Sequence, residues 1–135
     1  MLAVLAVATI VGLLWRRREG RVGEPVSTED GRDVREVLRE LEVDPAAASL
    51  TFVQFSSAFC APCRGTRQVL ARAAETTPGI RHVEVDAESH LDVVRALSIL
   101  RTPTTLAVDP AGREITRIVG QPRLEQVRHL AATVG

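Results

Sequence analysis

The sequence predicts an α/β fold, in which a central mixed sheet is flanked by helices and preceded by one N-terminal membrane helix. Short segments rich in β-branched and aromatic residues are interleaved with segments whose apolar residues recur at helical spacing. The last two of the strand-like segments follow each other through a turn and therefore form an antiparallel hairpin. An uncharged apolar run at the start of the chain predicts the membrane helix.

Residues 1–18 have the composition of a transmembrane anchor with a basic flank. MLAVLAVATIVGLLW carries no charged side chain, and four arginines lie within RRREGR, which follows it. Apolar residues occupy all faces of this helix, so we expect residues 2–15 to contact the lipid bilayer. Because basic flanks stay on the cytoplasmic side, the pattern predicts a single-pass protein of the cell membrane whose folded domain is cytoplasmic. An extracytoplasmic domain is the alternative.

Residues 19–32 are predicted to be a polar tether, because EGRVGEPVSTEDGR contains three glycines and a proline. A first short strand is expected in this tether near residues 25–27. The folded domain is assigned to residues 24–135, a length that supports one hydrophobic core, and we expect it to be a monomer. The net charge of zero argues against nucleic acid as a partner.

The first half of the domain alternates between helix and strand. Residues 33–43 form an amphipathic helix, because apolar residues recur at i, i+3, i+4 and i+7. LTFVQF, at residues 50–55, is short and rich in β-branched and aromatic residues and is predicted to be a buried strand. A helix over residues 62–76 follows it and is ended by Pro78 and Gly79.

The second half begins with an alternating strand over residues 80–86 and a helix over residues 90–98. After Pro103, TPTTLAVD is a strand, DPAG is a turn and REITRIV is its antiparallel partner. A final amphipathic helix covers residues 122–133. Both faces of the sheet therefore have helices available to cover them.

Both cysteines lie in FSSAFCAPCRGT, where a strand ends and a helix begins. This junction puts Cys60 at the helix N-terminus, where unpaired N–H groups and the positive end of the helix dipole favour a thiolate. Pro62 suits an early helical position, and two intervening residues bring Cys63 close enough to Cys60 for a disulfide. The pattern favours a redox pair over two thiols packed in a core.

A metal site is the competing interpretation of the two cysteines. A single CxxC supplies half of the ligands that structural zinc needs. His82, His90 and His129 lie in an alternating strand or on charged helices, where a histidine is usually solvated. We therefore predict no metal and no cofactor. A binding or metal-holding module with little turnover is the alternative function of another class.

The sequence resembles the thioredoxin family over residues 25–134. An apolar strand, an aromatic residue, CxPC and a basic residue are followed by TPT at residues 102–104, by AGR at a hairpin turn and by a glycine after the next strand. The resemblance implies a thioredoxin-like fold and a thiol–disulfide oxidoreductase that acts on a disulfide-containing client protein with a thiol electron donor. It also implies that Cys60 attacks, that Cys63 resolves and that Pro103 is a cis-proline.

The resemblance further assigns the residues that bind the substrate. They are Phe59, Ala61, Pro62, Thr102, Pro103 and Gly120.

Four positions depart from the common pattern of the family. Phe59 and Ala61 stand where many thioredoxins have Trp and Gly, and Thr102 stands where cytosolic thioredoxins often have Ile. Gln54 occupies the place of a buried Asp that is thought to help deprotonate the resolving cysteine. Gln cannot accept a proton at neutral pH, so the base would be water or an acid on the neighbouring strand, Glu84 or Asp86.

The sequence therefore predicts a membrane-tethered oxidoreductase that reduces protein disulfides through a dithiol–disulfide cycle of Cys60 and Cys63. The alternative within the same class resembles the anchored proteins that supply reductant for extracytoplasmic assembly, such as cytochrome c maturation.

Overall fold

The computed structural model describes residues 2–18, 20–23 and 33–134. Its α-helices are α1 (Leu2–Arg18), α2 (Val34–Glu40), α3 (Ala61–Thr76), α4 (Leu91–Ala96) and α5 (Leu124–Val134). Its strands are β1 (Arg21–Gly23), β2 (Leu50–Ser56), β3 (Ile80–Asp86), β4 (Thr104–Val108) and β5 (Glu114–Val119). Two short 3-10 helices, η1 (Pro45–Ala47) and η2 (Ala87–Ser89), lie in the connections.

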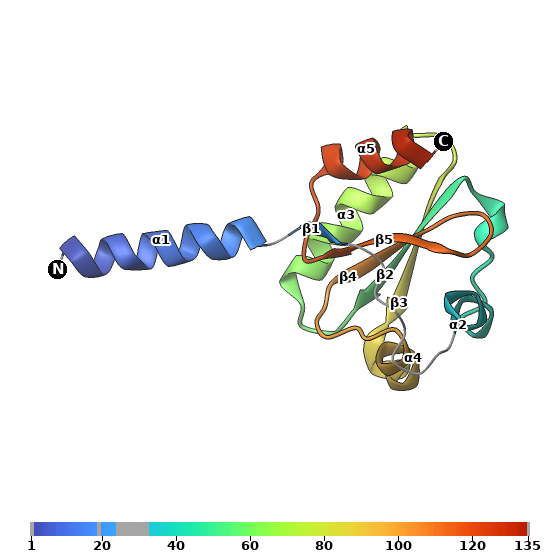
Figure 1. The fold of residues 1–135 in the computed structure, drawn as a ribbon, viewed down its shortest axis with the longest axis horizontal. Coiled ribbons are helices and arrows are strands. Elements are labelled where there is room, and N and C mark those ends of the chain that lie inside the picture. Colours follow the sequence, from blue (N-terminus) through green and yellow to red (C-terminus); the bar gives the residue numbers. More distant parts are fainter. Residues whose placement is uncertain (1, 19, 24–32, 135) are drawn as a thin grey trace.

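The five strands form one mixed sheet in the order β1-β5-β4-β2-β3. β2 and β3 run parallel, because α3 crosses between them, whereas the other neighbours are antiparallel. The prediction of a mixed sheet with a terminal β4–β5 hairpin is confirmed. Figure 1 shows the sheet between its helices, with α3 and α5 close together on one side of it and α2 and α4 away from them.

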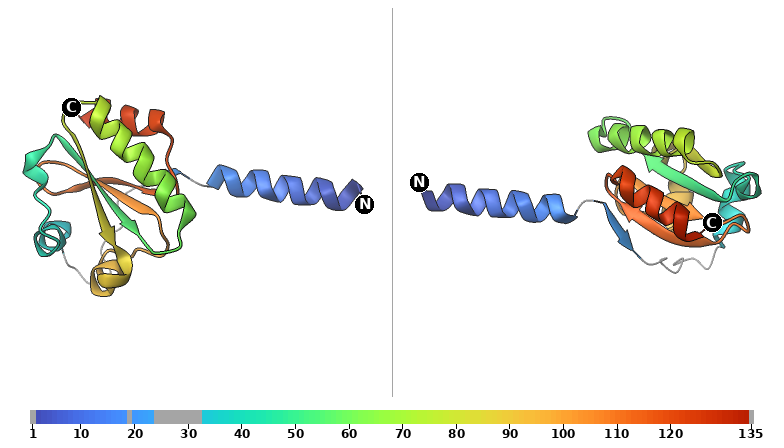
Figure 2. Two further views of the ribbon diagram at one scale, coloured as in Figure 1. Left: turned by 180° about the vertical axis from the view of Figure 1, so that it is seen from behind. Right: turned by 90° about the horizontal axis from the view of Figure 1, so that it is seen from above.

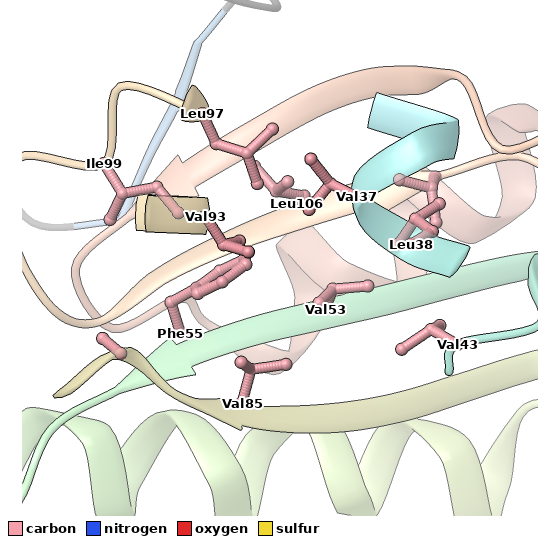
Figure 3. Packing of buried hydrophobic residues seen from close by; sticks show 12 residues of the cluster. Val37, Leu38, Val43, Val53, Phe55, Val85, Val93, Leu97, Ile99 and Leu106 are labelled. Atoms are coloured by element: carbon pink, nitrogen blue, oxygen red, sulfur yellow. The ribbon is translucent and has the colours of Figure 1, made fainter. Parts of the chain in front are cut away.

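Each face of the sheet carries its own apolar cluster. β2 supplies both, because alternate residues of a strand point to opposite faces. Phe55 and Val53 pack with Leu106 under α2 and α4, as Figure 3 shows. Phe52 points the other way and packs with Leu70 of α3 and other buried residues of that face. All seven residues of β2 are buried, as expected for the central strand that carries the cysteine motif at its end.

β1 lies inside the segment that the sequence analysis assigned to a tether. The strand expected near residues 25–27 falls outside the described residues, but Arg21–Gly23 pair with β5 at the sheet edge. The Gly20 amide donates to the Val119 carbonyl at 3.0 Å, and Gln126 donates to the Gly20 carbonyl at 3.2 Å. A Cβ on Gly20, whose φ is +70°, would approach the Gln121 carbonyl to 2.8 Å. Residues 20–23 are thus bound closely to the sheet.

The prediction of a single-pass membrane protein was wrong. α1 is helical, and Figures 1 and 2 show it extending away from the rest of the chain. However, the helix has 17 residues, and its last three are arginines. The 14 residues before them span about 21 Å, whereas the hydrocarbon core of a bilayer is about 30 Å thick. Over the residues described here, no helix has the length and apolar character needed to cross a membrane.

The predicted contact of residues 2–15 with lipid and the predicted side of the membrane both depended on that span, and neither is supported. What the structure does show of α1 is its exposure. The large apolar side chains from Val4 to Leu14, among them Leu5 and Ile10, are about half exposed or more.

Candidate active site

The cysteine pair lies at the junction of β2 and α3, as the sequence predicted. Cys60 is the N-cap of α3, and Pro62 occupies the first turn, where a missing N–H leaves no helical hydrogen bond unmade. Cys60 and Cys63 form a disulfide with a Cα–Cα distance of 5.2 Å. The backbone N–H of Cys63 donates to Cys60 Sγ at 3.2 Å, so the sulfur takes the place of the oxygen of an ordinary capping residue.

The two cysteines differ in exposure. Cys63 is 2% exposed, because it lies on the inner face of α3, whereas Cys60 is only half-buried. Phe59, just before the pair, has a φ of +48° and is fully exposed. Ala61 and Pro62 are exposed as well. The surface around Cys60 is therefore open and partly apolar.

A second loop borders the disulfide. The Thr102–Pro103 peptide bond is cis, and Thr102 Oγ1 lies 3.9 Å from Cys60 Sγ. The carbonyl of Pro103 accepts from the amide of Gly120 at 2.8 Å. Gly120 has a φ of +85°, a conformation that glycine adopts without strain. The structure thus brings Thr102 into contact with Cys60 and joins Gly120 to Pro103, the residue that follows Thr102.

Gln54 lies next to the backbone of Cys63. Its Nε2 donates to the carbonyl of Cys63 at 2.9 Å and to Ser56 Oγ at 2.8 Å. The carbonyl can only accept, so the amide orientation is fixed, and Oε1 must then accept from Nε2 of His82 at 2.9 Å. Gln54 is fully buried, and each of its polar atoms has a partner. It supports the first turn of α3 but offers no group that accepts a proton.

Charged groups on β3 and α3 adjoin this amide. Arg67 donates to both carboxylate oxygens of Glu84, at 2.6 and 2.8 Å, and these hydrogen bonds lower the pKa of Glu84. The Ser89 hydroxyl lowers the pKa of Asp86. Both acids are thereby made weaker bases, which argues against either as the proton acceptor for Cys63. Burial lowers the pKa of His82, so this side chain is neutral near pH 7.

Two features of the site were not found from the sequence. His82 is half-buried and bonded to Gln54, so the expectation that it is simply solvated was wrong. Ser57 contacts Thr102, with 2.8 Å between the two hydroxyl oxygens. Among the described residues, no group of three or more His, Cys, Asp and Glu side chains is placed to hold a metal ion. The metal-holding alternative therefore gains no support from the structure.

A disulfide at a helix N-terminus exchanges readily with other thiols, since the thiolate released on reduction is stabilised there. This chemistry, on a mixed sheet flanked by helices, defines the class of the protein, which is that of the thiol–disulfide oxidoreductases.

Comparison with known proteins narrows the class. The thioredoxin family model matches residues 38–133. A thioredoxin of Mycoplasma genitalium is 31% identical over 83 residues, which cover 62% of this chain and 80% of that protein. Thioredoxin H-type 1 of Nicotiana tabacum is 33% identical over 90 residues, which cover 63% of this chain and 71% of the relative.

A solved structure shares the fold. A mutant thioredoxin from Halobacterium salinarum NRC-1 superposes with a TM-score of 0.64 at 19% identity, covering 71% of this chain and 83% of the other. Because the family model matches more than half of the sequence, the chain belongs to the thioredoxin family. Members of this family act on disulfide-containing proteins and use thiol reductants.

Proposed function

We propose that the protein reduces the disulfides of client proteins, with Cys60 as the attacking cysteine and Cys63 as the resolving cysteine. The observation that carries the proposal is the unequal exposure of the pair at the start of α3. Cys63 is 2% exposed, whereas Cys60 lies half-buried beside an open surface. A client disulfide must be approached directly by the attacking sulfur, so only Cys60 is suited to the first step.

The cycle conserves atoms and electrons. The Cys60 thiolate attacks one sulfur of the client disulfide, the client S–S bond breaks, and one client cysteine leaves as a thiolate. The Cys63 thiolate then attacks Cys60 Sγ, and the second client thiolate leaves. Two electrons pass from the dithiol to the client, and the two protons of the cysteine thiols reach the client thiolates through solvent. A thiol donor then reduces the Cys60–Cys63 disulfide.

The client would lie across the surface that the two loops form. Phe59, Ala61 and Pro62 offer exposed apolar contacts on one side of Cys60. Thr102 borders the sulfur on the other side. Pro103 and Gly120 are buried and bonded to each other, so we assign them the role of shaping this surface from behind.

Two serine variants test the order of attack. Cys63→Ser should form a stable mixed disulfide with a client, because it keeps the nucleophile and lacks the resolving thiol, whereas Cys60→Ser should form none. Each variant is incubated with oxidised insulin, and the products are resolved on a non-reducing gel and by mass spectrometry. The unmodified protein is assayed for insulin reduction with dithiothreitol. Trapping by Cys60→Ser, or absence of insulin reduction, would contradict the proposal.

A further inference from the structure

We propose that Ser57 is a positioning residue for Cys60. Its hydroxyl donates to Thr102 and thereby directs the Thr102 hydroxyl toward Cys60 Sγ. The inference rests on the proposed function, in which the Cys60 thiolate attacks. Ser57 follows β2, and Thr102 precedes β4, so the hydroxyl pair joins the two loops that border the sulfur.

The proposed arrangement assigns a donor to each contact. Thr102 Oγ1 lies 3.9 Å from Cys60 Sγ, and a disulfide sulfur carries no hydrogen, so only Thr102 can donate in this long contact. Either hydroxyl can donate in the 2.8 Å contact between Ser57 and Thr102. A hydroxyl has one proton, so a Thr102 hydroxyl that is directed at the sulfur must accept from Ser57. In this arrangement the two O–H dipoles point the same way, toward the sulfur.

This alignment matters once the disulfide is reduced. The attacking species is a thiolate, which accepts hydrogen bonds more strongly than a neutral sulfur does. Two donors face Cys60 Sγ, the backbone N–H of Cys63 at 3.2 Å and the hydroxyl of Thr102. The bond from Ser57 polarises the Thr102 hydroxyl and prevents it from rotating away. Without Ser57, the Thr102 proton is free to point elsewhere.

Charged side chains also lie near Ser57, and their effect on Cys60 must be separated from that of the Ser57 hydroxyl. Arg67, Glu84 and Asp86 line a pocket of about 310 Å³ together with Ser57. Glu88 accepts from the amide of Ala58 on the same loop. Replacing Ser57 by Ala alters none of these charges, so a change in the titration of Cys60 would report the hydroxyl.

The test measures the thiolate of the reduced full chain. Iodoacetamide alkylation is followed by mass spectrometry from pH 5 to pH 10, and the 2% exposure of Cys63 directs the label to Cys60. Below the midpoint of the profile, Thr102→Val should lower the rate about tenfold and Ser57→Ala about threefold. At high pH, where the thiolate is complete, the deficit should disappear, and the variants should react as fast as the unmodified protein or slightly faster, because a thiolate of higher pKa is more nucleophilic. Ser57→Thr, which keeps a hydroxyl, should restore the profile.

A double variant separates positioning from a general structural effect. If Ser57 acts through Thr102, adding Ser57→Ala to Thr102→Val changes nothing further. Additive effects, or a decrease of equal size at every pH, would overturn the inference. Insulin reduction by the unmodified protein reports on the proposed function separately. If that reduction occurs and the alkylation profile of Ser57→Ala is unchanged, only the role of Ser57 fails.

Discussion

At the scale of single residues, Gln54 supports the cysteine motif but cannot serve as its base. Its amide holds the first turn of α3 by donating to the carbonyl of Cys63. The same amide cannot take a proton from the thiol of Cys63. We infer that position 54 contributes to stability in this chain and leaves the proton transfer to other groups.

Replacing this amide by a carboxylate of the same length should destabilise the fold. Gln54→Glu loses the donor to Cys63 and places a charge in a fully buried position, so the free energy of unfolding at pH 7 should fall by about 1 to 3 kcal/mol. Urea denaturation at pH 5 and pH 8 measures the effect. The loss should be larger at pH 8, because burial raises the pKa of the new carboxyl group against the opposing hydrogen bond from His82, and protonation at lower pH restores a donor.

Gln54→Met is the uncharged control. It loses the donor to Cys63 and also the acceptor for His82, but it adds no carboxyl group. Its loss should therefore not increase from pH 5 to pH 8, whereas that of Gln54→Glu should. A Glu variant as stable as the unmodified protein at pH 8 would show that the amide contributes nothing to the first turn.

His82 should make the free energy of unfolding depend on pH below about pH 6.5. Burial lowers its pKa below 6.5, with Glu84 opposing and Arg67 assisting the change. As the pH falls below 6.5, the unfolded chain binds the proton first, so the free energy of unfolding decreases until the folded-state pKa is passed. Glu84, whose pKa is lowered from 4.5, adds its own loss only at more acidic pH. Denaturation curves at half-unit steps from pH 7.5 to pH 5 measure the slope.

His82→Gln should flatten this dependence, because the group that titrates is removed. His129→Gln removes an exposed histidine and is the control. Equal slopes for the two variants would show that His82 does not couple folding to protonation.

These residues also show how far the sequence could predict the site. The Cys60–Cys63 pair was predictable, because a strand-to-helix junction and a spacing of three are local features. The bond between Gln54 and His82 was not, because it depends on the register of β2 against β3, which pairs Phe52 with His82 and Gln54 with Glu84. The Ser57–Thr102 contact spans 45 residues and has no local signal either.

At the scale of elements, the sequence predicted the order of strands and helices from residue 33 onward, because each segment there has either a clear apolar period or the β-branched composition of a buried strand. β1 was not predicted, since RVG is too short to carry any period. β1 is recognised only from the sheet, where its three residues pair with residues of β5. The Thr116 hydroxyl also donates to the carbonyl of Gly23, at the far end of the strand. We therefore place the start of the domain at residue 20.

Two truncated proteins test this boundary. A chain that begins at residue 19 should be as stable as the full chain, whereas one that begins at residue 24 should lose about 1 to 3 kcal/mol. The loss follows from the missing hydrogen bonds to β5 and α5, each of which contributes about 1 kcal/mol. Guanidinium denaturation with a fluorescence or circular dichroism readout compares the midpoints. Identical midpoints for the two truncated proteins would show that β1 is dispensable.

At the scale of the whole molecule, the redox pair lies at one end of the sheet, and helices cover both faces of the sheet. Figure 2 shows that α1 departs from the same end at which α3 begins. The sequence predicted a helix at residues 1–18 because the run is uniformly apolar. It could not predict the relation of that helix to the redox pair, which depends on the pairing of β1 with β5.

That relation has a consequence for kinetics. The amide of Gly20 donates to the carbonyl of Val119. The next residue, Gly120, donates to the carbonyl of Pro103, which follows Thr102, the residue in contact with Cys60. Only residue 19 separates Gly20 from the end of α1. A protein that bound α1 would therefore be held close to the disulfide. Disulfides of that protein would react with Cys60 and Cys63 at the high effective concentration of an intramolecular reaction. Free clients in solution would compete with such a molecule at a large kinetic disadvantage.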